Sequence, residues 1–164
     1  MIELDVVTTL VAPLAQCLRA RGWRLATAES CTGGLIAAAC TSLAGSSDWF
    51  ERGFVTYSNE AKRDQLGVDA ALIEAHGAVS AEVAAAMAAG ALARSPADVA
   101  VAVTGIAGPG GAVPGKPVGT VWLALARRGA GATVERLQLD GDRASVRAQT
   151  LVIALQRLRL LCTG

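Results

Sequence analysis

The chain has 164 residues, with 15 basic and 14 acidic side chains, a net charge of +1, and 18% charged against 52% hydrophobic residues. This length fits one domain over residues 1–164, and the balanced charge argues against a nucleic-acid partner. No apolar run reaches the length of a bilayer span, and the acidic start of the chain lacks the positive charge of a signal peptide, so we expect no membrane partner.

Hydrophobic spacing predicts helices where apolar residues recur every three to four positions, and strands where short apolar runs meet polar turns. In chain order these are a helix over 5–21, a strand over 23–28, a helix over 35–43, a strand over 53–57, a helix from 59, helices over 69–75 and 80–94, strands over 98–103, 118–126 and 133–139, and a helix over 142–161. The short loop 127–132 favours an antiparallel hairpin, and Ser80 and Asp142 suit helix caps. This order predicts an α/β fold, a three-layer α/β/α sandwich with a mixed, mostly parallel sheet.

Polar or glycine-rich loops follow three of the predicted strands. They span residues 30–34, 57–62 and 104–111. Ligands of open α/β sheets bind beyond the carboxyl ends of the strands, so we expect the three loops to meet at one rim and face one pocket. This convergence is the main sequence signal for a functional site.

Ser30 lies where the first predicted strand turns into a helix. Its hydroxyl is expected beside the free backbone amides of residues 31–34, which could hold a phosphate or a developing oxyanion. The alternative is that Ser30 or Thr32 only caps the following helix. Spacing alone leaves both interpretations open.

A serine needs a base to become a nucleophile. The single histidine, His76, is far in sequence from every rim loop and is predicted at the surface or at the edge of the core. Lys62 is the alternative base, because a lysine desolvated beneath a pocket can lose its proton and then accept one from a serine. Tyr57 could relay that proton or orient the pair. The competing interpretation of Lys62 is a solvated helix residue.

Two further motifs suggest other chemistry. Segment 110–116 has the G-x4-G-K spacing of a phosphate-binding loop, but Pro117 stands where a Ser or Thr must ligate Mg²⁺, and a strand follows instead of a helix. We therefore reject an NTPase and expect Lys116 to shape a glycine-rich flap. Cys31, at a helix N-terminus, is either a thiolate nucleophile or a small apolar residue that fills space under the turn.

Arg143 and Arg147 lie four residues apart, on one face of the last predicted helix. They either pair with local acids or reach the pocket and bind a phosphate. The nearby Asp140 and Asp142 are predicted to serve as turn and cap residues. Spacing does not decide which of the two arginines would contact a phosphate.

The four cysteines show no CxxC motif and no pairing with histidine at zinc-ligand spacing. They are Cys17, Cys31, Cys40 and Cys162. Because the chain shows neither a disulfide pattern nor an export signal, reduced thiols and a cytoplasmic location are predicted, with no metal and no cofactor. The low charge and high apolar fraction favour a homo-oligomer, a dimer or larger.

Five motifs together resemble the CinA C-terminal domain family. They are TAESCTGG at 27–34, YSNEAK at 57–62, AVS at 78–80, VTGIAGPGG at 103–111 and KPVGTV at 116–121. The resemblance covers essentially the whole chain. It implies hydrolysis of the carboxamide of nicotinamide mononucleotide to nicotinic acid mononucleotide and ammonia, as in pyridine-nucleotide recycling. The family also contains competence- or damage-inducible proteins, so the alternative is a catalytically inactive nucleotide-binding module.

The resemblance also implies roles for particular residues. It makes Ser30 the nucleophile and Lys62 its base, with Tyr57 assisting. The substrate-binding set that it implies consists of Cys31, Thr32, Gly33, Gly34, Thr104, Gly105, Gly108, Gly111, Arg143 and Arg147. The expected partner is therefore a small-molecule mononucleotide.

Overall fold

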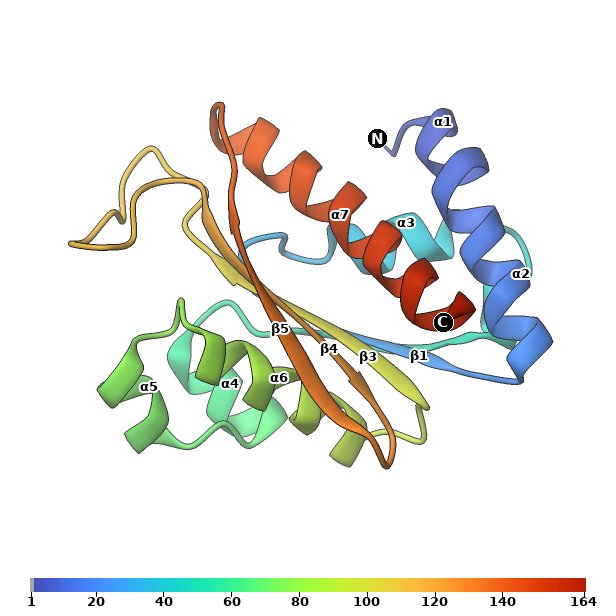
Figure 1. Cartoon of the computed structure of the whole chain (residues 1–164), viewed down its shortest axis with the longest axis horizontal. Coiled ribbons are helices and arrows are strands. Elements are labelled where there is room, and N and C mark those ends of the chain that lie inside the picture. The colour runs from blue at the N-terminus through green and yellow to red at the C-terminus, as the bar shows by residue number, and fades with distance from the viewer. Residues whose placement is uncertain (1) are drawn as a thin grey trace.

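A computed structural model describes residues 2–164, and its centre is a five-stranded sheet with the order β2-β1-β3-β4-β5 (Figure 1). The strands are β1 (Leu25–Glu29), β2 (Phe50–Val55), β3 (Val99–Gly105), β4 (Thr120–Arg127) and β5 (Gly131–Gln138). Strand β1 pairs in parallel with β2 and β3, whereas β4 pairs antiparallel with β3 and β5. Four of the five strands therefore run the same way, which confirms the predicted mixed, mostly parallel sheet and the hairpin.

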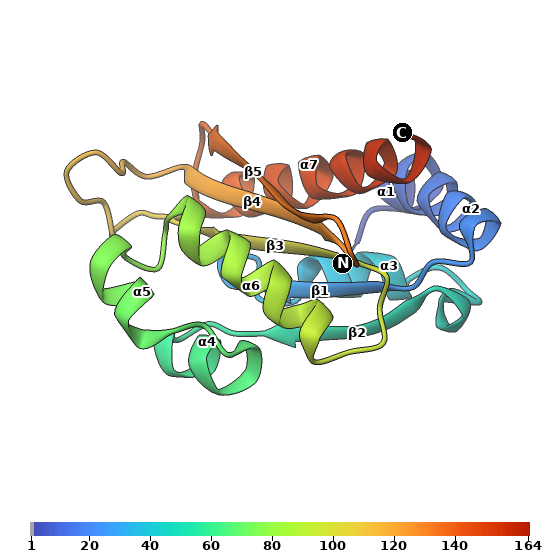
Figure 2. The ribbon, with the colours of Figure 1, turned by 60° about the horizontal axis from the view of Figure 1, so that its bottom comes forward.

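Helices cover both faces of the sheet (Figures 1 and 2). On one face lie α1 (Leu4–Val6), the π-helical turn η1 (Val7–Val11), α2 (Ala12–Arg21), α3 (Leu35–Thr41) and α7 (Arg143–Thr163). On the other face lie α4 (Asn59–Leu66), α5 (Ala70–His76) and α6 (Ala81–Ala93), and a short 3-10 turn, η2 (Ser46–Asp48), precedes β2. This is the predicted three-layer sandwich. Within residues 2–164, no helix has both the length and the apolar character needed to cross a membrane.

The central strand β3 divides the core into two layers. Its valines, Val99, Val101 and Val103, pack with the apolar residues of α2, α3 and α7. Its alanines, Ala100 and Ala102, belong to the opposite cluster, which is built largely from the alanine-rich α6. Small side chains on this face let α6 lie close to the sheet, because little volume separates the two backbones.

One predicted strand was misplaced. Strand β2 covers Phe50–Val55 and not residues 53–57. Its first residue, Phe50, pairs with Leu25 at the edge of the sheet, and its side chains are only half-buried or exposed. An edge strand of this kind has no continuous apolar run to mark its start. Tyr57 therefore lies beyond the strand, in the loop before α4.

The prediction of four reduced thiols is wrong, because Cys17 and Cys162 form a disulfide. They belong to α2 and α7, which pack side by side, and their Cα atoms are 6.1 Å apart, within the usual range for a disulfide. Because the two cysteines are 145 positions apart along the chain, no local spacing pattern indicates the pair. Cys31 and Cys40 are buried free thiols.

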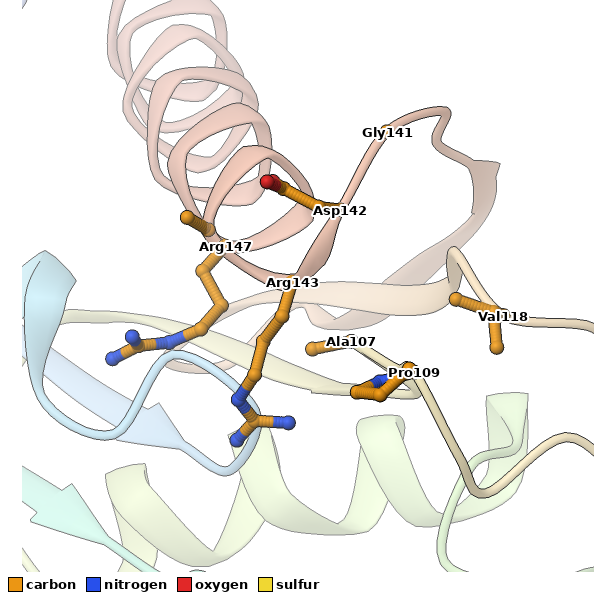
Figure 3. A pocket seen from close by; sticks show the side chains of 8 residues that line it. Ala107, Pro109, Val118, Gly141, Asp142, Arg143 and Arg147 are labelled. Carbon is orange, nitrogen blue, oxygen red and sulfur yellow. The ribbon is translucent and has the colours of Figure 1, made fainter.

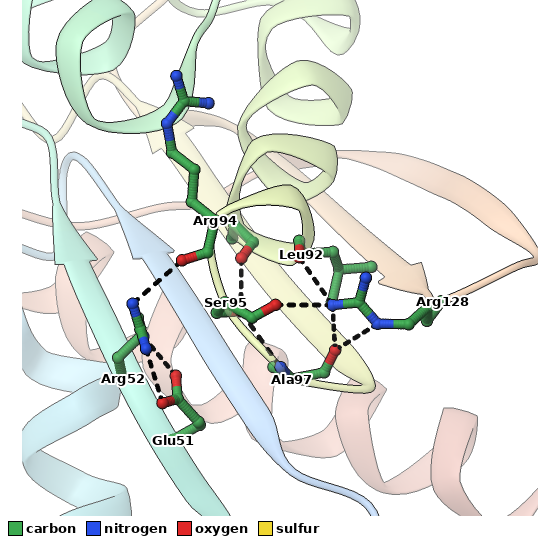
Figure 4. Close-up of polar contacts among 8 residues, drawn as sticks. Glu51, Arg52, Leu92, Arg94, Ser95, Ala97 and Arg128 are labelled. Carbon is green, nitrogen blue, oxygen red and sulfur yellow. Dashed lines mark hydrogen bonds and ion pairs between the residues drawn. The ribbon is translucent and has the colours of Figure 1, made fainter.

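The C-terminal end of α6 is held by Arg128 (Figure 4). Its guanidinium donates hydrogen bonds to the carbonyl oxygens of Leu92 at 2.7 Å, Ser95 at 2.9 Å and Ala97, the last from Nε at 3.0 Å. Nearby, Arg52 pairs with Glu51 and donates to a further carbonyl at this helix end. A cation here ties the last turn of the helix to the loop that follows it, and it complements the helix dipole.

We expect Arg128→Met to lower the free energy of unfolding by about 2 kcal/mol, because several hydrogen bonds from a charged donor are lost at once. Urea unfolding followed by circular dichroism measures this change. The matched control is Arg63→Met, at an exposed arginine of α4, with an expected change near zero. Equal stabilities of the two variants would show that Arg128 does not hold the helix end.

Candidate active site

Ser30 follows β1 directly, at the start of a tight turn that leads into α3. Its amide donates to the carbonyl of Val103 in β3 at 3.0 Å, and its own carbonyl accepts from the amide of Gly33 at 3.0 Å. The turn closes through Gly33 and Gly34, whose φ angles of 57° and 105° lie in the region that favours glycine. We call residues 30–34 the nucleophile turn, because they include the serine predicted from the sequence to be the nucleophile. The sheet thus fixes its first residue, and the glycines bring the chain back toward the helix.

Glu29 is the residue that caps α3. Its carboxylate is fully buried and accepts from the amides of Ile36 at 2.9 Å and Ala37 at 3.0 Å, and from the Thr32 hydroxyl at 2.6 Å. Neither Ser30 nor Thr32 caps the helix, so that alternative is wrong. Sequence reasoning missed this role of Glu29; the signal was an acid close before a helix whose N-cap position is glycine.

Lys62 reaches Ser30 from the first turn of α4. Its side chain is buried, with the residue 1% exposed, and Nζ lies 3.0 Å from Ser30 Oγ and 2.9 Å from the carbonyl oxygen of Thr56. Burial lowers the pKa of the Lys62 ammonium, with the Cys31 thiol acting in the opposite direction. No carboxylate among residues 2–164 forms an ion pair with it. These surroundings favour the neutral amine and exclude a solvated helix residue.

The three predicted loops do meet at one cavity, of about 240 Å³. Ser30 and Cys31 come from the first loop, Tyr57 and Lys62 from the second, and Thr104 and Gly105 from the third. The lining also includes Asn59, Ala78, Val79, Ala107 and Arg143. Of these, Asn59, Ala78, Val79 and Ala107 were not among the predicted site residues. The two that precede α6 are held there because the Thr104 hydroxyl donates to the Ala78 carbonyl at 2.9 Å.

A second cavity, of about 710 Å³, lies beside the first, at the N-terminal end of α7 (Figure 3). Ala107 and Arg143 line both cavities. Arg143 donates to the Tyr57 hydroxyl at 2.7 Å and to the Gly108 carbonyl at 3.0 Å, so it connects two of the rim loops. The larger cavity is lined by Arg143 and Arg147, whose guanidinium groups suit an anion, and by Asp142, whose carboxylate already accepts from the Ser145 amide at the start of α7.

The remaining predicted residues take different places. Arg147 donates to the carbonyls of Cys31 and Thr32, both at 3.2 Å. Thr32, Gly33 and Gly34 build the nucleophile turn and do not line the smaller cavity. Gly111 lines neither cavity; a Cβ at this position would lie 3.3 Å from the Ile106 side chain.

The alternative nucleophile and base fit this geometry less well. Burial raises the pKa of the Cys31 thiol to about 11, so at neutral pH it is protonated and weakly nucleophilic. His76 is exposed as predicted, pairs with Glu82 at 3.7 Å, and does not line the smaller cavity. Lys116 lies in the flap and donates to the His76 carbonyl at 2.7 Å. Residues 2–164 contain no cluster of three or more His, Cys, Asp or Glu side chains suited to a metal.

A family model and curated relatives of this chain point to the same family. The model of the CinA C-terminal domain matches residues 7–162. A protein of Pseudomonas putida named nicotinamide-nucleotide amidohydrolase PncC is 54% identical over 98% of this chain and 99% of its own length. A longer CinA-like protein of Citrifermentans bemidjiense is 58% identical, and there the match with this chain covers 35% of the relative's length.

Solved structures agree with this result. The crystal structure of the competence/damage inducible protein CihA from Agrobacterium tumefaciens has a TM-score of 0.94 and 45% identity, and the match covers 100% of this chain and 99% of that one. The matched family region contains all the loops that build the two cavities, from the nucleophile turn to the start of α7. The chain therefore belongs to the CinA C-terminal domain family.

Proposed function

We propose that this protein is a nicotinamide-nucleotide amidohydrolase, which converts nicotinamide mononucleotide to nicotinic acid mononucleotide and ammonia. The observation that carries the proposal is the contact of 3.0 Å between Ser30 Oγ and the buried Nζ of Lys62. A buried amine without a carboxylate partner can activate a serine at moderate pH. The PncC name of relatives that match this chain over nearly its full length supports the choice of substrate.

The proposed reaction begins with a proton transfer. Neutral Lys62 takes the proton of the Ser30 hydroxyl, and Oγ attacks the carboxamide carbon. When the tetrahedral intermediate collapses, the C–N bond breaks and the Lys62 ammonium returns its proton to the leaving nitrogen, which departs as ammonia. Water, deprotonated by Lys62, then attacks the acyl-enzyme ester. The carboxylic acid is released and Ser30 regains its proton.

The oxyanion is proposed to bind in the nucleophile turn. Within the part of the chain that the structure describes, the amides of Cys31, Thr32 and Gly34 have no acceptor, whereas that of Gly33 is used inside the turn. Glu29 already occupies the amides of Ile36 and Ala37, so we assign the donors to the turn and not to α3 itself. Of the three residues with free amides, Cys31 lines the smaller cavity. One such preorganised donor contributes about 3 kcal/mol to transition-state stabilisation.

We propose that the substrate spans both cavities. Its carboxamide enters the smaller one at Ser30, and its phosphate lies in the larger one beside Arg143, at the N-terminus of α7. Tyr57 assists through its hydroxyl, which holds Arg143 at the mouth. The whole chain would act as one domain. A cytoplasmic location and a homo-oligomeric state stay predictions from the sequence.

The test is ammonia release by the wild-type protein from nicotinamide mononucleotide, nicotinamide and NAD. We expect turnover of the mononucleotide, and a kcat/KM for nicotinamide lower by roughly 10- to 100-fold or more, because nicotinamide lacks the phosphate that Arg143 would bind through charged hydrogen bonds. No ammonia from the mononucleotide would overturn the proposed function. If the alternative of an inactive binding module holds, the mononucleotide would stabilise the fold, by about 2.7 kcal/mol at a hundredfold excess over Kd, without turnover.

A further inference from the structure

We propose that Arg147 is a positioning residue that holds the nucleophile turn in its reactive shape, and that Arg143 alone of the two arginines binds the phosphate. This inference rests on the proposed function of the Ser30 site. It assigns different roles to two arginines that share one helix face and that sequence spacing alone does not distinguish.

The contacts of Arg147 are with the backbone of the turn. It lies one helical turn after Arg143 on α7, and both side chains extend toward the rim, Arg147 toward the loop that follows β1 (Figure 3). Its Nε donates to the Cys31 carbonyl and its Nη2 to the Thr32 carbonyl, both at 3.2 Å. Although Arg147 also borders the larger cavity, these bonds commit two of its three nitrogens to the turn.

Holding these two carbonyls determines how the neighbouring amides point. In a trans peptide, the C=O of one residue and the N–H of the next point in opposite directions. The bond from Arg147 to the Cys31 carbonyl therefore directs the Thr32 N–H away from the guanidinium. The Thr32 amide is one of those in the turn with no acceptor among residues 2–164. Thr32 itself is fully buried, whereas Cys31 lines the smaller cavity. Arg147 thus fixes the peptide between Cys31 and Thr32, and with it the position of the free Cys31 amide that faces the oxyanion.

Arg143 is bound differently. Its partners, the Tyr57 hydroxyl and the Gly108 carbonyl, lie on the mouth of the cavities and not on the nucleophile turn. The Arg143 side chain is exposed, whereas Arg147 is half-buried against the turn. Loss of Arg143 should therefore weaken substrate binding, and loss of Arg147 should weaken the chemical step.

The experiment compares Arg147→Ala with Arg143→Ala in steady-state turnover of nicotinamide mononucleotide. We expect Arg147→Ala to lower kcat about 100-fold, the effect of one misplaced oxyanion donor, with KM changed by less than about twofold. Added guanidinium, below denaturing concentrations, should restore part of the lost kcat. Arg143→Ala should mainly raise KM. A raised KM with unchanged kcat in Arg147→Ala would overturn the inference and assign Arg147 to the phosphate.

A second measurement tests the role of Arg147 independently of the proposed amidase activity. A fluorophosphonate probe reacts with an activated serine without any amide turnover, and its transition state also carries an oxyanion. We expect slower labelling of Ser30 in Arg147→Ala and wild-type labelling in the control Arg159→Ala, at an exposed arginine near the other end of α7. If wild type is labelled but releases no ammonia, the proposed substrate fails while the labelling rates still decide the role of Arg147. If Arg147→Ala unfolds, Arg147→Lys is measured instead, because lysine keeps the charge but cannot donate to both carbonyls as the guanidinium does. A wild-type labelling rate in Arg147→Lys would contradict the inference.

Discussion

Lys62→Met is expected to lower the kcat of the proposed amidase by about 10³-fold or more, within the range that a general base contributes. Methionine has nearly the length of lysine but cannot accept a proton, so Ser30 would lose its activating partner at 3.0 Å. Ser30→Ala should be equally inactive. Because the two groups act as one unit, the double variant should lose little more than either single one.

The matched control is Lys116→Met, which makes the same chemical change at the chain's other lysine, in the flap. Its kcat should stay close to that of wild type. Circular dichroism of each variant confirms that the fold is retained. Full turnover in Lys62→Met, or losses in the two single variants that add up in the double variant, would exclude a Ser–Lys pair as the catalytic unit.

The pH dependence follows from the same amine. Burial lowers the pKa of Lys62, and only the neutral amine is a base, so kcat/KM should rise with pH through that lowered pKa and level off above it. The same lowered pKa makes the free energy of unfolding depend on pH. Between the lowered pKa and the ordinary value near 10.5, the unfolded chain binds a proton that the folded chain does not. In that interval the wild-type free energy of unfolding should rise with pH relative to Lys62→Met.

Gly90→Ala is expected to lower the free energy of unfolding by about 3 kcal/mol, although alanine is the better helix former by about 1 kcal/mol. Gly90 lies in α6 where it crosses α4. A Cβ there would lie 2.0 Å from the backbone oxygen of Leu66 and 2.9 Å from its carbonyl carbon, so the backbones would have to separate. Because α4 also carries Lys62, kcat should fall as well.

The control for this substitution is the reverse change at the neighbouring exposed position, Ala89→Gly. It should cost only about 1 kcal/mol, through helix propensity alone. Both variants are measured by urea unfolding and by ammonia release. If Gly90→Ala were as stable as wild type, the close packing of α6 on α4 would not limit this position.

The sequence was sufficient to predict the layers of the fold and the three loops of the smaller cavity. Both depend on local patterns: apolar runs for buried strands, helical spacing, and polar residues at strand ends. Lys62 could be proposed from its place in the second loop, but its burial could not, because burial depends on how α4 packs against the sheet. The disulfide between Cys17 and Cys162 was missed for the same reason, since only the packing of α2 on α7 brings the two thiols together.

Contacts across the nucleophile turn were also beyond sequence reasoning. The spacing of Arg143 and Arg147 predicts a shared helix face, but their different partners depend on where α7 crosses the rim. Glu29 was visible in the motif, yet its bonds to the amides of α3 arise only when the turn folds back over it. Side chains that bind backbone atoms leave a weak sequence signal, because any carbonyl or amide of suitable geometry could be their partner.

Helix α7 also separates the cavities, at its N-terminal end, from the C-terminus of the chain. Its 21 residues span roughly 30 Å at 1.5 Å per residue. One end supplies Arg143 and Arg147 to the cavities, and the other lies beside α2 (Figure 1). A fluorophore, a surface anchor or a fused domain attached after Gly164 would thus begin about one helix length from Ser30. Such an attachment leaves the cavity mouth open, so the protein could be immobilised through this end without obstructing its substrate.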